Sequence, residues 1–441
     1  MGYPGVVVRL NVILTVIALL SMAQQNNSAA APCPCDIYAA GGTPCVGAHS
    51  VVRALYQRYN GPLYQVRRAS DKKTMDIYPV APGGLASAAS QDSFLSGTTG
   101  TVSIIYDQSG NNNDLTKAPA GCAYNRPDTE ATATGDTVMV GGYKVYGLYQ
   151  GTHRGYRKDT ANSLATGNKP EGMYWVVNGK HYNSACCFDY GNAETNNCGS
   201  GGTGTMAALN FGTECWFSPC QGNGPWIFAD LEGGLFAGGT GVNSNNTPVA
   251  YNYVTGMLKS STTTYTIRAG NAQSGTLKTM WDGNLPAPEH LQGSLILGIG
   301  GDNSGSGVGT FYEGAMTSGR PPDTTEDAVQ RNIVAAGYGQ TTAIKPDPNE
   351  MTPSQMCLFK VRYNPSNANA VISYALQDAG RVIMNIFDIN GRHIAAIVNG
   401  VIPVGLHEAI WDAKRVPTGI YIWKIAIDGR SGGSGRIVIG K

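Results

Sequence analysis

The segment 224–236, GPWIFADLEGGLF, alternates between two kinds of side chain at the two-residue period of a β-strand. One face would hold two aromatic rings and then two carboxylates, and the other would hold small apolar side chains. The first face would hold Trp226, Phe228, Asp230 and Glu232, and the second would hold Ile227, Ala229 and Leu231. Carboxylates beside rings on a sheet are costly unless they meet water or a polar ligand such as a sugar. The pattern therefore predicts a carbohydrate site on one face and a core on the other.

A second segment, 294–303, also has the pattern of a buried strand, with Leu295, Leu297 and Ile299 expected on one face. Glycines clear the space just before Asp302. Two strands that each end in a carboxylate would supply an acid/base pair across a groove. The alternative is that residues 302–305 form only a turn and that Glu232 is a charge at a strand end.

The composition favours an all-β protein without nucleic acid as a partner. Of 441 residues only 14% are charged, the formal net charge is +1, and 59 are glycine. Nucleic-acid binding would favour a basic stripe. Strands are expected at 102–106, 172–177 and 264–268. Helices are expected at about 47–59 and at 324–337, where Thr325 could cap the start and Gly337 would end the second helix.

Residues 1–23 have the features of a signal peptide, with Arg9 before an apolar run and a small-residue cleavage site. The run is too short for a stable membrane span. We therefore expect an exported protein without a membrane span.

Ten cysteines in an exported chain indicate disulfides rather than metal ligands. Cys35 and Cys45 would close one short loop, and Cys215 and Cys220 another. Four further cysteines cannot be paired from the sequence: Cys33, Cys122, Cys198 and Cys357. The adjacent pair Cys186 and Cys187 could form one bond, two separate bridges or two free thiols.

The chain changes character after the second predicted helix. A polar, proline-rich linker is expected at 343–356. Short alternating segments follow at 370–375, 382–387, 408–411 and 419–425, with the spacing of a small β-sandwich. This region has no cluster of carboxylates, histidines or cysteines of a catalytic kind.

Long motifs between about residues 33 and 340 resemble the family 54 glycoside hydrolases of the arabinofuranosidase B type. They occur in family order at 35–50, 104–110, 171–174, 181–195, 298–304 and 309–319. The resemblance implies a concanavalin-like β-sandwich as a catalytic domain at 33–342. It also implies a secreted, retaining, exo-acting α-L-arabinofuranosidase that releases L-arabinofuranose from arabinoxylan or arabinan and needs no metal or organic cofactor.

The same resemblance assigns roles to individual residues. Glu232 falls on the nucleophile and Asp302 on the general acid/base. Asp230 falls on a sugar-binding carboxylate, and Cys186–Cys187 on a disulfide that packs against the sugar. Further substrate-binding positions fall on Trp216, Gly233, Leu235 and Gly301. Gly233 replaces the asparagine usual in the family, so we expect one polar contact to the sugar to be lost or to be supplied by another residue.

The region 357–441 resembles the immunoglobulin-like C-terminal sorting domains of type IX secretion, on segments 364–366, 387–392 and 417–423. Surface attachment is therefore an expected outcome of export, and the enzyme is expected to be a monomer. Two other functions stay open from the residues alone. A lectin-like binder would need Asp230 and Trp216 but not both Glu232 and Asp302. An endo-acting xylanase or arabinanase would need an open groove.

Overall fold

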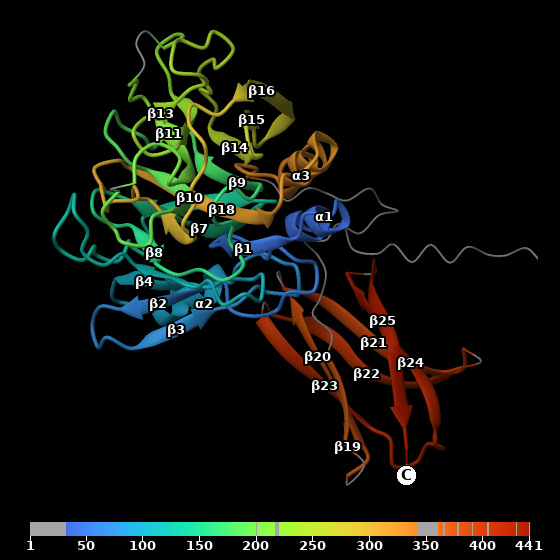
Figure 1. Ribbon diagram of the computed structural model, residues 1–441. Coiled ribbons are helices and arrows are strands. Elements are labelled where there is room, and N and C mark those ends of the chain that lie inside the picture. The colour runs from blue at the N-terminus through green and yellow to red at the C-terminus, as the bar shows by residue number, and fades with distance from the viewer. Residues whose placement is uncertain are drawn as a thin grey trace, which may run out of the picture. The chain divides into compact units, whose positions relative to one another are not determined.

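The computed structural model describes residues 32–199, 201–216, 220–341, 360–364, 367–376, 379–389, 391–403, 405–428 and 430–440. The predicted signal peptide, the predicted linker and Cys357 lie outside these ranges. Within them the chain is mostly β-strand, as predicted (Figure 1). No helix in these ranges is long and apolar enough to cross a bilayer.

Two large antiparallel sheets make up the part of the chain before residue 341. The described strands of the first follow the order β16-β15-β14-β9-β18-β7-β6, with β1 paired to β18. In chain order they are β1 (Cys45–Ser50), β6 (Asp136–Val140), β7 (Tyr143–Gln150), β9 (Glu171–Asn178), β14 (Tyr253–Ser260), β15 (Thr264–Asn271), β16 (Ser274–Asn284) and β18 (Gly309–Ser318).

The described strands of the second sheet follow the order β13-β12-β11-β10-β17-β8-β5-β4-β2-β3. In chain order they are β2 (Tyr64–Arg68), β3 (Thr74–Ile77), β4 (Gly100–Ile105), β5 (Leu115–Lys117), β8 (Tyr156–Lys158), β10 (Asp189–Ala193), β11 (Ala207–Gly212), β12 (Trp226–Asp230), β13 (Leu235–Phe236) and β17 (Ser294–Leu297).

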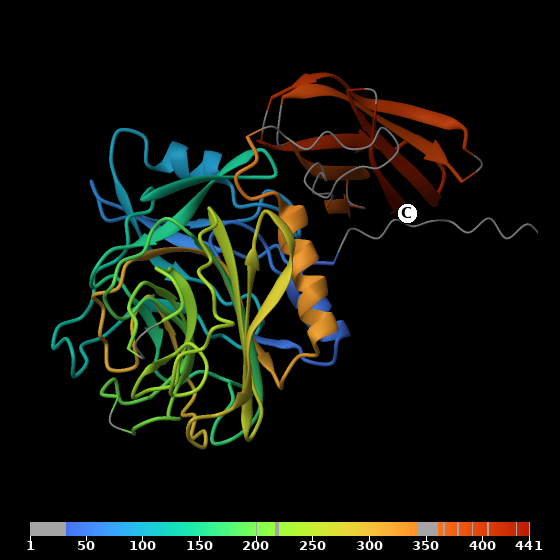
Figure 2. The same cartoon turned by 90° about the horizontal axis from the view of Figure 1, so that it is seen from above.

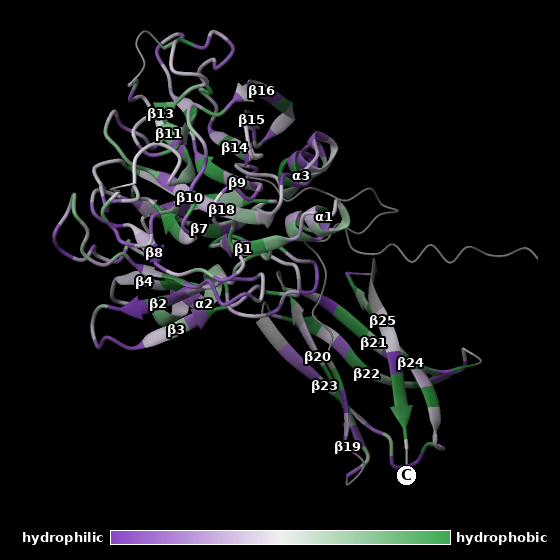
Figure 3. Cartoon of the chain, in the orientation of Figure 1, coloured by the Kyte–Doolittle hydropathy of each residue, from purple (hydrophilic) through white to green (hydrophobic). Residues whose placement is uncertain are grey.

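Both sheets contribute to one hydrophobic core, which explains the alternation in the sequence. Ile227, Ala229 and Leu231 lie in this core together with Val176 and Phe311 of the other sheet. The opposite face of β12 forms a separate cluster, made of Trp226, Phe228, Leu235 and Ala237. The predicted division of β12 into a core face and a second face is confirmed. Apolar residues are concentrated on the strands (Figure 3).

The described helices are α1 (Pro34–Ala40), α2 (Ala88–Phe94) and α3 (Asp323–Ala336). The predicted helix at 47–59 is wrong, because its first residues form β1, which is buried along its whole length and pairs with β18. The predicted helix at 324–337 is α3, and Gly337 ends it with a φ of 76°. Thr325 is not its cap, since the N-cap is Pro322 and Thr325 is buried.

Helix α3 lies beside strands of the first sheet (Figure 2). A buried ion pair holds it there. Glu326 accepts a hydrogen bond from Arg268 of β15, with a nitrogen–oxygen distance of 2.9 Å. Both side chains are almost fully buried.

The chain after residue 359 has a hydrophobic core of its own and two smaller sheets. The described strands of one are β19 (Lys360–Asn364), β20 (Asn369–Leu376) and β23 (Gly405–Asp412). Those of the other are β21 (Gly380–Asp388), β22 (His393–Ile402), β24 (Gly419–Ile427) and β25 (Arg430–Ile439). Four of these strands, β20, β21, β23 and β24, were expected from the sequence.

Candidate active site

Glu232 lies in the tight turn that joins β12 to β13. Asp230 and Leu235 are paired across the two strands, so residues 231–234 form the turn. Glu232 has a φ of 60° and Gly233 a φ of 72°. A left-handed conformation is uncommon for a residue with a long side chain, and such strain is concentrated at functional sites. The backbone N–H of Glu232 donates to Oδ1 of Asp230 at 3.1 Å, which holds the turn.

Asp302 lies in a loop after β17 rather than in the strand itself. The strand ends at Leu297, and Gly298 has a φ of 76°. Ile299 was expected on the same face as Leu295. After this bend it packs instead with Ile296 in a small separate cluster, so the predicted alternation stops at Leu297. A turn therefore exists here, as the alternative reading proposed, and it carries the carboxylate. Its Oδ1 accepts a hydrogen bond from the backbone N–H of Ser304 at 2.9 Å.

The fold brings Glu232 and Asp302 together around Gly199. A Cβ placed on Gly199 would lie 3.0 Å from Oε1 of Glu232 and 3.1 Å from Cβ of Asp302. Both residues thus border the space beside Gly199, although they are far apart in the sequence. Gly199 has a φ of 55°, so neither its conformation nor its surroundings favour a side chain. No sequence pattern pointed to this residue.

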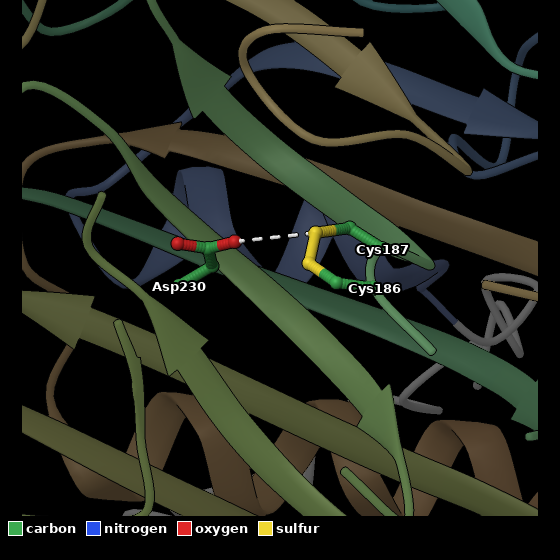
Figure 4. A group of neighbouring side chains, drawn as sticks. All are labelled: Cys186, Cys187 and Asp230. Carbon is green, nitrogen blue, oxygen red and sulfur yellow. Dashed lines mark hydrogen bonds between the residues drawn. A yellow bond between two sulfur atoms is a disulfide. The ribbon is translucent and has the colours of Figure 1, made fainter. Parts of the chain in front are cut away.

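Cys186 and Cys187 form a disulfide beside Asp230 (Figure 4). The peptide bond between the two cysteines is cis. Sγ of Cys187 lies 3.7 Å from Oδ2 of Asp230 and 3.5 Å from Oγ of Ser304. The disulfide therefore touches both the β12 carboxylate and the loop of Asp302.

The other predicted substrate-binding residues differ in their surroundings. Leu235 is fully buried against Trp226 and Phe228, so it supports the turn of Glu232. The carbonyl of Gly301 accepts a hydrogen bond from Nη1 of Arg157 at 2.8 Å. Trp216 is 53% exposed. The roles of Trp216, Gly233, Leu235 and Gly301 in sugar binding stay predictions.

Three buried carboxyl groups that the sequence analysis did not select surround this site: Asp189, Glu194 and Glu214. Oε1 of Glu194 accepts a hydrogen bond from Oγ1 of Thr205 at 2.5 Å. Nδ2 of Asn210 donates to Oδ1 of Asp189 at 2.6 Å. The only sequence signal for them was that two of the three lie in the family motif at 181–195.

Burial in this cluster raises the pKa values of several carboxyl groups. Burial raises the pKa of Glu214 to about 7. It also raises the pKa of Asp230 to about 7, although hydrogen bonds from Asp189 and from the backbone of Glu232 lower it. Burial raises the pKa of Asp189 well above its usual range, and the charge of Asp230 adds to this effect.

The pKa of Glu232 is raised to about 8, first by burial and then by the charges of Glu194, Asp230 and Asp302. We predicted a like-charge cluster, and the structure contains one. We expected this cluster to help keep Asp302 protonated, and that effect stays a prediction. The acid role of Asp302 therefore stays a prediction that rests on the family motif.

The predicted disulfides Cys35–Cys45 and Cys215–Cys220 are both present. Two of the cysteines that the sequence left unpaired, Cys122 and Cys198, form a further disulfide. Cys33 is a buried free thiol.

Comparison with known proteins identifies the family. The sequence profile described as "Alpha-L-arabinofuranosidase B, catalytic" matches residues 34–339. Alpha-L-arabinofuranosidase B of Emericella nidulans is 50% identical over 339 residues, which are 74% of this chain and 66% of that protein. The Aspergillus oryzae protein of the same name is 51% identical over 316 residues, 69% of this chain and 62% of that protein. The chain thus spans somewhat less than two thirds of these relatives.

Solved structures give the same result. An arabinofuranosidase in complex with arabinofuranosyl-α-1,2-xylobiose is 43% identical, with a TM-score of 0.68 over 79% of this chain and 73% of that one. A family 54 α-L-arabinofuranosidase soaked with a cyclic sulfate inhibitor is 44% identical, with the same TM-score and coverage. The chain belongs to the family of α-L-arabinofuranosidase B catalytic domains, glycoside hydrolase family 54.

Proposed function

We propose that this protein is a retaining, exo-acting α-L-arabinofuranosidase. The observation that carries the proposal is the meeting of Glu232 and Asp302 around Gly199, next to a disulfide that lies against Asp230. A retaining glycosidase needs two carboxyl groups about 5 Å apart. A lectin-like binder has no need of two such groups, and the family relatives are named as enzymes.

The proposed reaction has two displacement steps. In the first, the Glu232 carboxylate attacks the anomeric carbon while Asp302 protonates the leaving oxygen, so that the glycosidic bond breaks and an arabinosyl ester forms. In the second, Asp302 takes a proton from water, which attacks the same carbon and releases Glu232 as a carboxylate. Because each step inverts the anomeric centre, the product retains its configuration.

Asp230 and the Cys186–Cys187 disulfide would bind the arabinose ring. A carboxylate accepts hydrogen bonds from sugar hydroxyls, and the rigid disulfide offers an apolar surface that loses no side-chain entropy on binding. Trp216, Gly233, Leu235 and Gly301 would complete the pocket. The polymers that fit this reaction are arabinose-containing hemicelluloses, arabinoxylan and arabinan among them.

We also propose that residues 1–23 direct export and that 357–441, joined through 343–356, serve secretion or surface attachment rather than catalysis. The separate core of the C-terminal strands supports this division. A protein truncated after Thr342 should keep activity on a soluble aryl arabinofuranoside within about tenfold. A larger loss in a folded protein would contradict the division.

One assay tests the central proposal. Purified protein should release free L-arabinose from 4-nitrophenyl α-L-arabinofuranoside, and NMR during the first minutes should show the α-anomer as the initial product. Appearance of the β-anomer would contradict a retaining mechanism. Absence of hydrolysis together with sugar binding would favour the lectin-like alternative.

A further inference from the structure

The Cys122–Cys198 disulfide joins two loops that meet at Asp302. The two cysteines are 76 residues apart in the sequence, and their Cα atoms are 4.7 Å apart. The backbone N–H of Cys122 also donates to the carbonyl of Asn197 at 2.9 Å, so the loops are paired at this point. Cys122 is exposed and Cys198 is partly exposed, which distinguishes this disulfide from the buried Cys35–Cys45 pair.

The first loop holds the backbone of Asp302. The N–H of Ala123 donates to the carbonyl of Asp302 at 3.0 Å. A Cβ placed on Gly121 would lie 2.5 Å from the same carbonyl oxygen and 2.6 Å from the carbonyl of Asn197. Tyr124 stacks on the ring of His153, with centroids 3.7 Å apart. The N–H of His153 in turn donates to the carbonyl of Gly305 at 2.7 Å, so this loop is tied to the Asp302 loop at two points.

The second loop reaches the place where the carboxylate of Glu232 and Cβ of Asp302 come together. Gly199, the residue after Cys198, is the point at which Oε1 of Glu232 and Cβ of Asp302 meet. The disulfide therefore connects the backbone that holds Asp302 to the backbone that separates Asp302 from Glu232. Small displacements of a catalytic group, of about 1 Å, can cost a factor of about 100 in rate.

We propose that the Cys122–Cys198 disulfide is a positioning element of the active site, which fixes Asp302 relative to Glu232. This inference rests on the catalytic pair proposed above. The disulfide would act through Gly199 and the backbone of Asp302. Its loss should therefore affect proton donation to the leaving group more than sugar binding.

The test compares a Cys122→Ala/Cys198→Ala variant with the unmodified protein on two substrates. A natural arabinoside such as an arabinoxylan oligosaccharide needs a proton on its leaving group, whereas 4-nitrophenol leaves without one. We expect kcat/KM, which reports the first displacement step, to fall by about 10- to 100-fold on the arabinoside and by about threefold or less on the aryl substrate. A Cys35→Ala/Cys45→Ala variant is the control, because that disulfide lies at α1 and β1. This control variant should have a lower Tm, and the ratio of its kcat/KM values on the two substrates should be unchanged.

If kcat/KM of the Cys122→Ala/Cys198→Ala variant falls equally on both substrates, or on neither, the inference is overturned. If the variant without Cys122 and Cys198 does not fold, Gly199→Ala decides: its Cβ would press on the carboxylate of Glu232 and on Cβ of Asp302, and a near-normal kcat/KM on the arabinoside would also overturn the inference. Failure of the proposed function is recognisable separately. In that case the unmodified protein releases no arabinose, or substitution of Glu232 and Asp302 leaves activity intact.

Discussion

Glu232 donates its backbone N–H to the side chain of Asp230, its neighbour but one, across 3.1 Å. The acceptor oxygen is Oδ1, while Oδ2 of the same carboxylate faces the sulfur of Cys187. One buried side chain thus stabilises the strained turn of the proposed nucleophile and borders the proposed sugar site. The roles of Glu232, Asp302 and the disulfide can be separated by experiment, because each acts at a different step.

Glu232 and Asp302 should fail in different ways. Glu232→Gly removes the attacking oxygen, so activity should fall by several orders of magnitude on every substrate. Asp302→Gly removes proton transfer, worth roughly 10²- to 10⁴-fold, and the loss should be severe for natural arabinosides but mild in the first step for an aryl leaving group. Added azide should then accelerate turnover of the Asp302 variant and give the α-configured azide adduct, because azide attacks the β-linked arabinosyl-enzyme with inversion, and NMR detects this adduct. Formation of that adduct by the Glu232 variant would reverse the two roles.

Replacement of Cys186 and Cys187 by alanine should weaken substrate binding more than it weakens the fold. The bond between adjacent residues closes no long loop, so it constrains the unfolded chain little. We expect KM for the aryl arabinofuranoside to rise by about tenfold, which corresponds to about 1.4 kcal/mol. The Tm should fall by only a few degrees. A large drop in Tm with an unchanged KM would show that the pair serves the fold rather than the pocket.

Glu194→Gln should move the acidic limb of the kcat/KM profile to lower pH. Attack requires the ionised form of Glu232, and the charge of Glu194 is the largest cause, after burial, of the raised pKa of Glu232. Glutamine keeps the volume and can still accept the hydrogen bond from Thr205. Glu171→Gln is a matched control, because Glu171 is equally buried but lies on β9 in the other sheet. If the acidic limb of the Glu194→Gln profile is unchanged or lies at higher pH, the predicted coupling between Glu194 and Glu232 is contradicted.

The protein should lose stability as pH rises from about 5 to about 8. The pKa values of Glu214 and Asp230 are raised to about 7, and that of Glu232 to about 8. In this window the folded state binds more protons than the unfolded state, so the free energy of unfolding decreases with increasing pH. Glu214→Gln removes one of these groups.

The measurement is the Tm at pH 5 and at pH 8. We expect Glu214→Gln to reduce the difference between the two values by roughly 3 °C or more. Asp282→Asn, which replaces a carboxylate that is 64% exposed, should leave the difference unchanged. A Tm that rises from pH 5 to pH 8 in the unmodified protein would refute the prediction.

Local pattern was enough to predict β12 and its two faces. Alternation between apolar and polar side chains depends on the backbone period alone, and Ile227 and Phe228 lie in separate clusters as that period requires. The short-range disulfide Cys35–Cys45 was predictable for a similar reason, because ten residues of chain bring the two cysteines together in many folds. Motif likeness located the two proposed catalytic carboxyl groups.

The tertiary structure decided what no local pattern contains. Gly298 bends the chain and places Asp302 in a loop, and the turn after β12 places Glu232 in a left-handed conformation. Gly199, brought in from a third segment, joins the two, and Glu194 becomes the neighbour that raises the pKa of Glu232. Proximity of this kind depends on which strands pair and on how tightly the loops pack. The sequence by itself therefore determined which residues could carry the chemistry, and only the packing of distant segments decided how close and how charged they are.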